Sequence, residues 1–154
     1  MSIWIHILVF LGVFFFMEFI AWSNHKYIMH GFLWRLHADH HKKDHNGWFE
    51  KNDWFFVIYA SVSISFFLLW RYDIFPLGLT IGVAIFCYGW TYFVVHDIFI
   101  HQRFKVFRNA DNRYAQAVRR AHKMHHKHLG KEGGECFGML IVPFKYFTDK
   151  KKPS

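Results

Sequence analysis

Histidines in a pattern that occurs twice are the residues of this chain whose type and spacing could support chemistry. The sequence has 13 histidines, and each half of the pattern reads HX4H followed by HX2HH. The ten patterned residues are His25, His30, His37, His40 and His41, then His96, His101, His122, His125 and His126. Neutral imidazole is a good ligand for zinc, copper, iron and nickel. We therefore predict that all ten patterned histidines bind metal and serve catalysis.

Helix geometry limits how these histidines can share metal ions. Positions i, i+3 and i+4 lie on one face of an α-helix, so segments 37–41 and 122–126 can each present three imidazoles to one pocket. Adjacent histidines diverge by about 100° around the axis, so two nearby metals would use them better than one. The HX4H pairs lie about 140° apart on an ideal helix. This angle predicts that they straddle a helix end or bind different ions.

Three apolar segments must position these histidines. They cover Ile3–Trp22, Trp54–Trp70 and Ile74–Val95, and each is long enough to cross a hydrocarbon layer of about 30 Å as a helix. The first lacks the basic n-region and the A-x-A-like site of a signal peptide, so we interpret it as a retained span. We predict a single-domain, all-α integral membrane protein over residues 1–154. About three transmembrane helices would be joined by cytoplasmic or interfacial helices that carry the histidine boxes.

Charge predicts the orientation of these spans. Of the 19 Lys and Arg residues, 18 follow span one or span three, and only Arg71 lies between spans two and three. The positive-inside rule makes the side that is rich in Lys and Arg the cytoplasmic one. We expect the protein to lie in the inner membrane. Both halves of the histidine pattern then emerge on that side and can meet at one site. The basic residues match no nucleic-acid-binding motif, so we expect no nucleic-acid partner.

The identity of the metal follows from chemistry and not from spacing. The two cysteines, Cys87 and Cys136, do not form the Cys-rich spacing of a structural zinc site. The membrane placement suggests a lipid-soluble substrate, and a redox-inert zinc pair would leave that placement unexplained. An iron pair suits an oxidation of such a substrate, because activation of O2 requires a metal that changes oxidation state. A metal-transport or storage protein remains an alternative, although it would favour ligands within the spans, where only His6 lies.

Six segments carry a resemblance to a known family: residues 17–31 (MEFIAWSNHKYIMHG), 37–41 (HADHH), 49–53 (FEKND), 92–104 (YFVVHDIFIHQRF), 121–133 (AHKMHHKHLGKEG) and 137–140 (FGML). In these segments the chain resembles the histidine-box membrane di-iron oxygenases of the fatty acid hydroxylase superfamily. The residues around the boxes resemble its carotenoid hydroxylase branch.

The resemblance implies a specific activity. Two non-haem iron ions would be held by the ten box histidines and would activate O2 as co-substrate. One oxygen atom would enter C3 of a β-ionone ring, taking β-carotene to β-cryptoxanthin and zeaxanthin. The other would leave as water, with two electrons from a ferredoxin or a reductase. A related membrane hydroxylase or ketolase acting on another carotenoid, a sterol or a fatty acyl lipid is the competing interpretation.

Several other polar and aromatic residues have more than one interpretation. Asp39 and Asp97 stand beside box histidines and could accept hydrogen bonds from imidazoles behind the metal, or be solvated carboxylates. Glu18 lies within span one, where an unpaired carboxylate is costly, so we expect a histidine or basic partner. Three phenylalanines could line a polyene channel or face lipid: Phe93, Phe99 and Phe104. His6, His45 and His128 fall outside the doubled pattern and are predicted not to be essential ligands.

Overall fold

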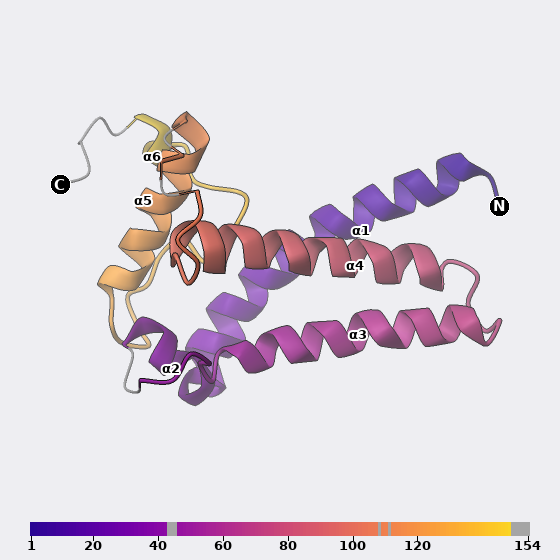
Figure 1. The fold of residues 1–154 in the computed structure, drawn as a ribbon, viewed down its shortest axis with the longest axis horizontal. Coiled ribbons are helices and arrows are strands. Elements are labelled where there is room, and N and C mark those ends of the chain that lie inside the picture. Colours follow the sequence, from indigo (N-terminus) through magenta and orange to yellow (C-terminus); the bar gives the residue numbers. More distant parts are fainter. Residues whose placement is uncertain (43–45, 108, 111, 149–154) are drawn as a thin grey trace.

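Helices form all the regular structure in the part of the chain that the computed structural model describes, residues 1–42, 46–107, 109–110 and 112–148. The elements follow in the order α1 (Ile3–Ser23), η1 (Asn24–Phe32), α2 (Trp34–His41), α3 (Asp53–Arg71), α4 (Gly78–Phe93), η2 (Val94–Ile100), α5 (Arg113–Lys127) and α6 (Lys145–Thr148). The two η elements are π-helices that continue α1 and α4 (Figure 1). The predicted all-α fold is confirmed.

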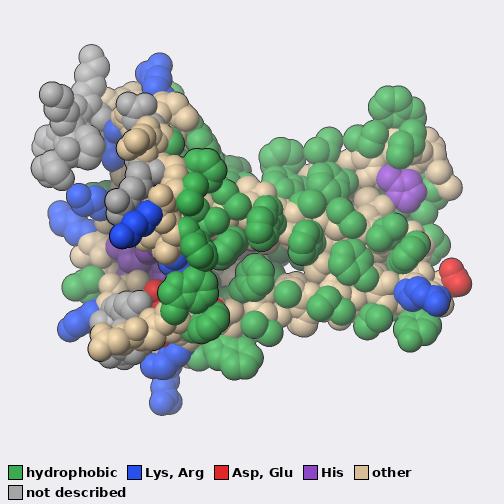
Figure 2. Space-filling view, viewed as in Figure 1, with side chains coloured by type: hydrophobic (Ala, Val, Ile, Leu, Met, Phe, Trp, Pro, Cys, Tyr) green, Lys and Arg blue, Asp and Glu red, His purple; other side chains and the backbone are tan. Residues whose placement is uncertain are grey.

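Three of these helical rods are long and apolar enough to cross a membrane: α1 with η1, α3, and α4 with η2. Their outward faces carry large exposed apolar side chains such as Leu8, Phe15 and Phe86. Figure 2 shows these hydrophobic side chains covering the spans on the visible face. Such a surface is stable against lipid and not against water. The three predicted spans are therefore confirmed among the described residues.

The third span begins later than the hydropathy pattern predicts. Helix α4 starts at Gly78, whereas the apolar segment starts at Ile74. Pro76 disfavours helical dihedrals at Phe75, the residue before it. Asp73 has a positive φ of 56°, which turns the chain back after α3. Residues 74–77 thus belong to the turn between α3 and α4.

Small residues let α3 and α4 pack closely as an antiparallel hairpin. A Cβ added at Gly82 would lie 2.6 Å from the Phe67 ring, so no larger residue fits there without movement. The Ser63 hydroxyl donates a hydrogen bond to the Gly82 carbonyl at 2.7 Å across the same contact. On the other side of α4, Ile85 and Tyr88 pack against Met17 of α1. The hairpin and α1 together form the membrane-embedded frame.

Glu18 ties the C-terminal segment to this frame. Its Oε1 accepts hydrogen bonds from the backbone N–H groups of Met139, Leu140 and Ile141 at 2.8, 2.8 and 3.0 Å. Its Oε2 accepts from the Tyr88 hydroxyl at 2.7 Å. The expected histidine or basic partner was wrong, because peptide N–H groups and a hydroxyl satisfy the carboxylate instead.

We expect Glu18→Ala to destabilise the protein by about 3 kcal/mol, because one buried and two part-buried N–H groups lose their acceptor and each such loss costs roughly 1–3 kcal/mol when the group is buried. Thermal unfolding in detergent, followed by loss of soluble protein, measures the effect. Tyr88→Phe is the control, since it removes one donor only and should cost about 1 kcal/mol. Equal stability of Glu18→Ala and the wild type would contradict this role.

Both halves of the histidine pattern lie at one end of the frame. The ends of η1 and η2 and the start of α3 are found there with α2, α5 and α6, whereas the N-terminus and the α3–α4 turn lie at the other end (Figure 1). Lys and Arg side chains gather at the same end (Figure 2). Gly31, with φ −103° and ψ −125°, breaks the first rod and directs the chain into α2.

Candidate metal centre

The HX4H pairs lie in π-helical turns, which bring residues five apart onto one side of the helix. In a π-helix each N–H bonds the carbonyl five residues earlier, and the backbone N–H of His101 bonds the carbonyl of His96 at 2.9 Å. The ring centroids of His25 and His30 are 5.3 Å apart, and those of His96 and His101 are 4.5 Å apart. The α-helical separation of about 140° therefore does not hold for His25 and His30, which belong to one group of histidines, while His96 and His101 straddle the end of η2, as the other alternative predicts.

The HX2HH boxes behave as α-helical geometry predicts. On α2, His37 and His41 share one face, while His40 points to a different group. On α5, His122 and His126 share a face, while His125 points away from them. Adjacent imidazoles thus serve different groups of histidines.

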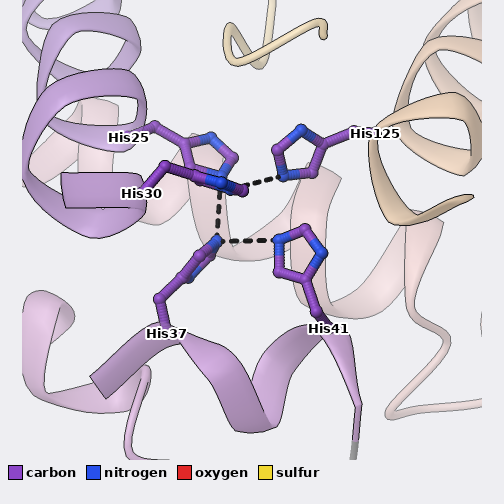
Figure 3. Close-up of side chains that lie close together, drawn as sticks. All are labelled: His25, His30, His37, His41 and His125. Atoms are coloured by element: carbon purple, nitrogen blue, oxygen red, sulfur yellow. Dashed lines mark hydrogen bonds between the residues drawn. The ribbon is translucent and has the colours of Figure 1, made fainter. Parts of the chain in front are cut away.

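Two groups of histidine nitrogens result among the described residues. The first cluster contains His25, His30, His37, His41 and His125, and the second contains His40, His101, His122 and His126. Within each cluster the ligand atoms lie within 4.8 Å of one another. Figure 3 shows the first cluster, with His125 of α5 facing histidines from η1 and α2. His96 adjoins the second cluster, with its Nε2 3.0 Å from the His40 Nε2.

Hydrogen bonds to the outer nitrogen orient every imidazole of the first cluster. The Nδ1 atoms of four histidines lie 2.9–3.0 Å from backbone carbonyls, in the pairs His25–Phe137, His30–Lys131, His41–His128 and His125–Glu135. The Nδ1 of His37 lies 2.7 Å from Oδ1 of Asn52. A carbonyl oxygen only accepts, so Nδ1 carries the hydrogen and Nε2 turns its lone pair into the cluster.

Carboxylates orient His40 of the second cluster and His96 beside it. The Nδ1 of His40 donates to Glu50 at 2.9 Å, and that of His96 donates to Asp97 at 3.2 Å. Arg103 links these two carboxylates, because its guanidinium contacts Glu50 at 3.0 Å and Asp97 at 3.1 Å. Hydrogen bonds to carboxylates make imidazoles stronger donors to a metal than hydrogen bonds to carbonyls do. The imidazoles of His40 and His96 therefore differ in electronic character from those of the first cluster.

The inner nitrogens are placed for a cation. Several Nε2 atoms lie close together, at 3.0 Å for His25 and His37, 3.1 Å for His37 and His41, 3.3 Å for His30 and His125, and 2.8 Å for His101 and His122. Where both rings carry hydrogen on Nδ1, two Nε2 lone pairs cannot bond each other. The buried Nε2 of His126 has no hydrogen-bond partner. A metal ion would satisfy these lone pairs, so the residues present fit one.

Burial keeps these imidazoles neutral, the form that binds metal. It lowers the pKa of His37 to about 2, that of His41 to about 4 and those of His125 and His126 to about 3, with further lowering from neighbouring histidines. Burial also holds the pKa values of His40 and His122 well below the usual 6.5. At neutral pH the lone pairs are available without loss of a proton.

Comparison with known proteins gives the family. The model of the family described as fatty acid hydroxylase matches residues 10–147. The chain belongs to the fatty acid hydroxylase family.

Several curated proteins similar to this fatty acid hydroxylase family member are named as beta-carotene hydroxylases. A "Beta-carotene hydroxylase" of Pantoea ananas is 41% identical over 92% of this chain and 79% of its own length. One of Pseudescherichia vulneris is 39% identical over 82% of this chain and 70% of its own length. The chloroplastic "Beta-carotene 3-hydroxylase 1" of Arabidopsis thaliana is 36% identical over 82% of this chain, which spans 41% of that longer protein. No solved structure matches the chain.

Sequence reasoning missed the residues behind several histidines of this fatty acid hydroxylase. Asn52 and Glu50 bond imidazoles and Arg103 contacts Glu50, but none of the three belongs to the histidine pattern. The acidic and amide residues of segment 49–53, just before span two, were the available signal. Asp97 lies against His96, as expected of an acceptor. Asp39 accepts from the backbone N–H of Lys51 at 2.7 Å and so anchors this segment, while its contact with an imidazole stays a prediction.

Of the three histidines outside the pattern, two are described by the structure, and neither belongs to a cluster. His6 is at the other end of the frame, where its Nδ1 lies 2.6 Å from the Thr80 hydroxyl. His128 contributes its backbone carbonyl to His41, and its ring belongs to neither cluster. His45 lies outside the described residues.

Proposed function

We propose that this fatty acid hydroxylase family member is a β-carotene 3-hydroxylase, which converts β-carotene to β-cryptoxanthin and then to zeaxanthin. The observation that carries this proposal is the pair of buried, inward-facing imidazole clusters at the end of three spans. Relatives named beta-carotene hydroxylase, similar over most of the chain, support the substrate. A site at the end of membrane helices suits a substrate that is dissolved in lipid.

Iron is the metal that suits this chemistry. The first cluster would hold one non-haem iron ion, and the second cluster with His96 would hold the other, so that all ten patterned histidines are ligands. When bound, the iron pair supplies the reduction of O2 in the overall reaction ring C–H + O2 + 2 e⁻ + 2 H⁺ → ring C–OH + H2O. Two electrons come from a ferredoxin or a reductase.

The chain's own residues position the ligands and exclude water. Backbone carbonyls of residues 128–137 fix four imidazoles of the first cluster, while Glu50 and Asp97 fix two in or beside the second. The rings of His37, His96 and His125 are almost completely buried, at 1%, 2% and 0% exposed. Ligands held from behind in this way keep the same geometry when a metal binds or leaves.

Production of hydroxylated carotenoids tests the proposal directly. The chain is expressed in a bacterium that accumulates β-carotene, and pigments are identified by chromatography and mass. We expect zeaxanthin and β-cryptoxanthin in aerated cells and unchanged β-carotene without oxygen. Unchanged β-carotene in aerated, iron-replete cells with the protein in the membrane would overturn the assignment. Keto-carotenoids alone would favour a ketolase.

The proposed location is the inner membrane, with both clusters on the cytoplasmic side and no nucleic-acid partner. The gathering of Lys and Arg at the end that contains α2, α5 and α6 supports this orientation (Figure 2). An electron donor from the cytoplasm would then reach the clusters directly.

Reporter fusions are expected to show this topology. A reporter after Ser154 and another inserted near Asn46 should both be active in the cytoplasm, because both lie on the basic side. A reporter within the turn from Arg71 to Asp73 should be active only in the periplasm. Alkaline phosphatase and a fluorescent protein, which are active on opposite sides, give the readout. A periplasmic signal near Asn46 would show that the orientation is wrong.

A further inference from the structure

A groove and an inner cavity lie along the spans next to the histidine clusters. The groove has a volume of about 530 Å³ and lies between α3 and α4, with walls that include Trp54, Phe56 and Val57 on α3 and Trp90 and Phe93 on α4. The cavity has a volume of about 80 Å³ and lies among all three spans, lined by Met17, Tyr59, Ile85 and Gly89, among others. Both have mainly apolar walls.

The two spaces share lining residues and lie beside residues that support the histidine clusters. Asp53, Phe56 and Asp97 line both spaces, so the two spaces adjoin each other, and together we call them the path. The inner cavity ends against Asn52 and Asp97. Asn52 bonds His37 of the first cluster, and Asp97 bonds His96 beside the second. The path therefore leads from the lipid-facing side of the hairpin to the support of both clusters.

We propose that this path is the binding site for the β-ring of the substrate, which enters sideways from the lipid between α3 and α4. This inference rests on the proposed function. The groove has the size of ordinary ligand pockets, roughly 300–1,000 Å³, and its aromatic walls suit an apolar polyene. A benzene-sized ring needs a cavity of roughly 150 Å³, so the inner cavity admits the leading edge of the ring while the rest stays in the groove.

The shape of the substrate agrees with this direction of entry. In a β-ionone ring, C3 lies opposite the carbon that carries the polyene, and the methyl groups lie on the carbons that flank that carbon. A ring that enters end-first therefore leads with C3, and its bulky end and polyene trail into the groove. The edge that reaches the cavity is the edge that would be hydroxylated.

The position of the path distinguishes among the three phenylalanines that could line a polyene channel or face lipid. Phe93 lines the groove, and the centroid of the Phe104 ring lies 6.4 Å from that of Phe93. Phe99 instead lies under the Arg119 guanidinium, 4.1 Å from its centre. Phe93 therefore belongs to the substrate path and Phe99 does not.

Gly89 gives a direct test of the inner cavity. A Cβ added there meets no atom within 4 Å, so a larger side chain can enter the cavity without displacing the backbone. Gly89→Leu should reduce product formation at least tenfold and reduce the β-carotene that copurifies with the protein, while bound iron stays unchanged. Gly89→Ala should have a smaller effect. Gly12→Leu is the matched control, because Gly12 is exposed on α1, has equally open surroundings and lines neither space; it should stay within twofold of the wild type.

Val57 tests the groove in the same way. Val57 lines the groove, and Val62, further along α3, lines neither space. Both side chains are exposed, at 51% and 41%. Val57→Trp should lower product formation and copurified β-carotene several-fold, whereas Val62→Trp should not. If Gly89→Leu loses iron or fails to fold, the comparison of Val57→Trp with Val62→Trp tests the substrate path instead.

The outcomes separate this inference from the proposed function. If the wild type produces no hydroxylated carotenoid, the proposed function fails. If the wild type is active and both Gly89→Leu and Val57→Trp stay within twofold of their controls, the substrate path is wrong although the function stands. Loss of product with undiminished bound β-carotene would also overturn the site, because the ring would then bind elsewhere. Phospholipid in place of β-carotene in the purified wild type would make the groove a lipid site and overturn the assignment.

Discussion

Replacement of His125 by Ala is expected to lower hydroxylated carotenoid at least about 100-fold, because a site misplaced by about 1 Å already loses that much. The His125 ring is completely buried, its Nδ1 bonds the Glu135 carbonyl, and its Nε2 faces His30 at 3.3 Å. Bound iron should fall with activity, since the first cluster loses a ligand. The measurement is product per unit of membrane-localised protein, with iron quantified in the same purified sample.

The same expectation holds for each of the ten patterned histidines and not for the others. His6→Ala is the control, because His6 lies at the opposite end of the frame beside Thr80 and should retain most activity. His128→Ala should keep part of the activity, since the backbone carbonyl that holds His41 remains. His45→Ala should also keep part of it. The ligand set is wrong if several patterned histidines prove dispensable while His45 or His128 is essential for iron.

Replacement of Arg103 by Leu is expected to lower activity about 10- to 100-fold, the usual cost of losing a residue that supports metal ligands. The guanidinium contacts Glu50, Asp53 and Asp97, two of which hold His40 and His96. Without it, the carboxylates are left with uncompensated charge, and His40 and His96 lose the fixed support for their orientation. Bound iron should fall from two ions per chain toward one, with the first cluster retained.

The spectrum of the bound iron distinguishes this role from a general loss of structure. Mössbauer spectroscopy should show one iron signal lost and the other kept. Arg103→Lys should be intermediate, because an ammonium group cannot contact three carboxylates with the geometry of a guanidinium. Arg35→Leu, a change at an exposed residue of α2, is the control and should leave iron unchanged. Full iron and activity in Arg103→Leu, or equal loss of both iron signals, would contradict this role.

The difference between the clusters has a consequence for their metals. Five neutral oxygen acceptors support the first cluster, whereas carboxylates support His40 and His96 at the second. Carboxylate support raises the basicity of an imidazole and favours the more highly charged metal ion. An iron ion bound at the second cluster, as proposed, would therefore be the harder of the two to reduce.

The sequence by itself determined the features that depend on local repetition. Long apolar runs predicted the three spans, because a helix in lipid must satisfy its own backbone hydrogen bonds and present apolar side chains all round. The HX2HH spacing predicted that His40 and His41 would serve different groups, since this follows from 3.6 residues per turn. The distribution of Lys and Arg placed both histidine boxes on one side of the frame.

Tertiary structure decided the features that depend on long-range contact. The spacing of His25 and His30 suits either an α-helical or a π-helical turn, and packing at the end of the span selects the π-helical one. His125 joins histidines from η1 and α2 because α5 lies across them, which no local pattern records (Figure 3). Backbone carbonyls hold four imidazoles, and a carbonyl is common to every residue, so its use as an acceptor leaves no signature in the sequence.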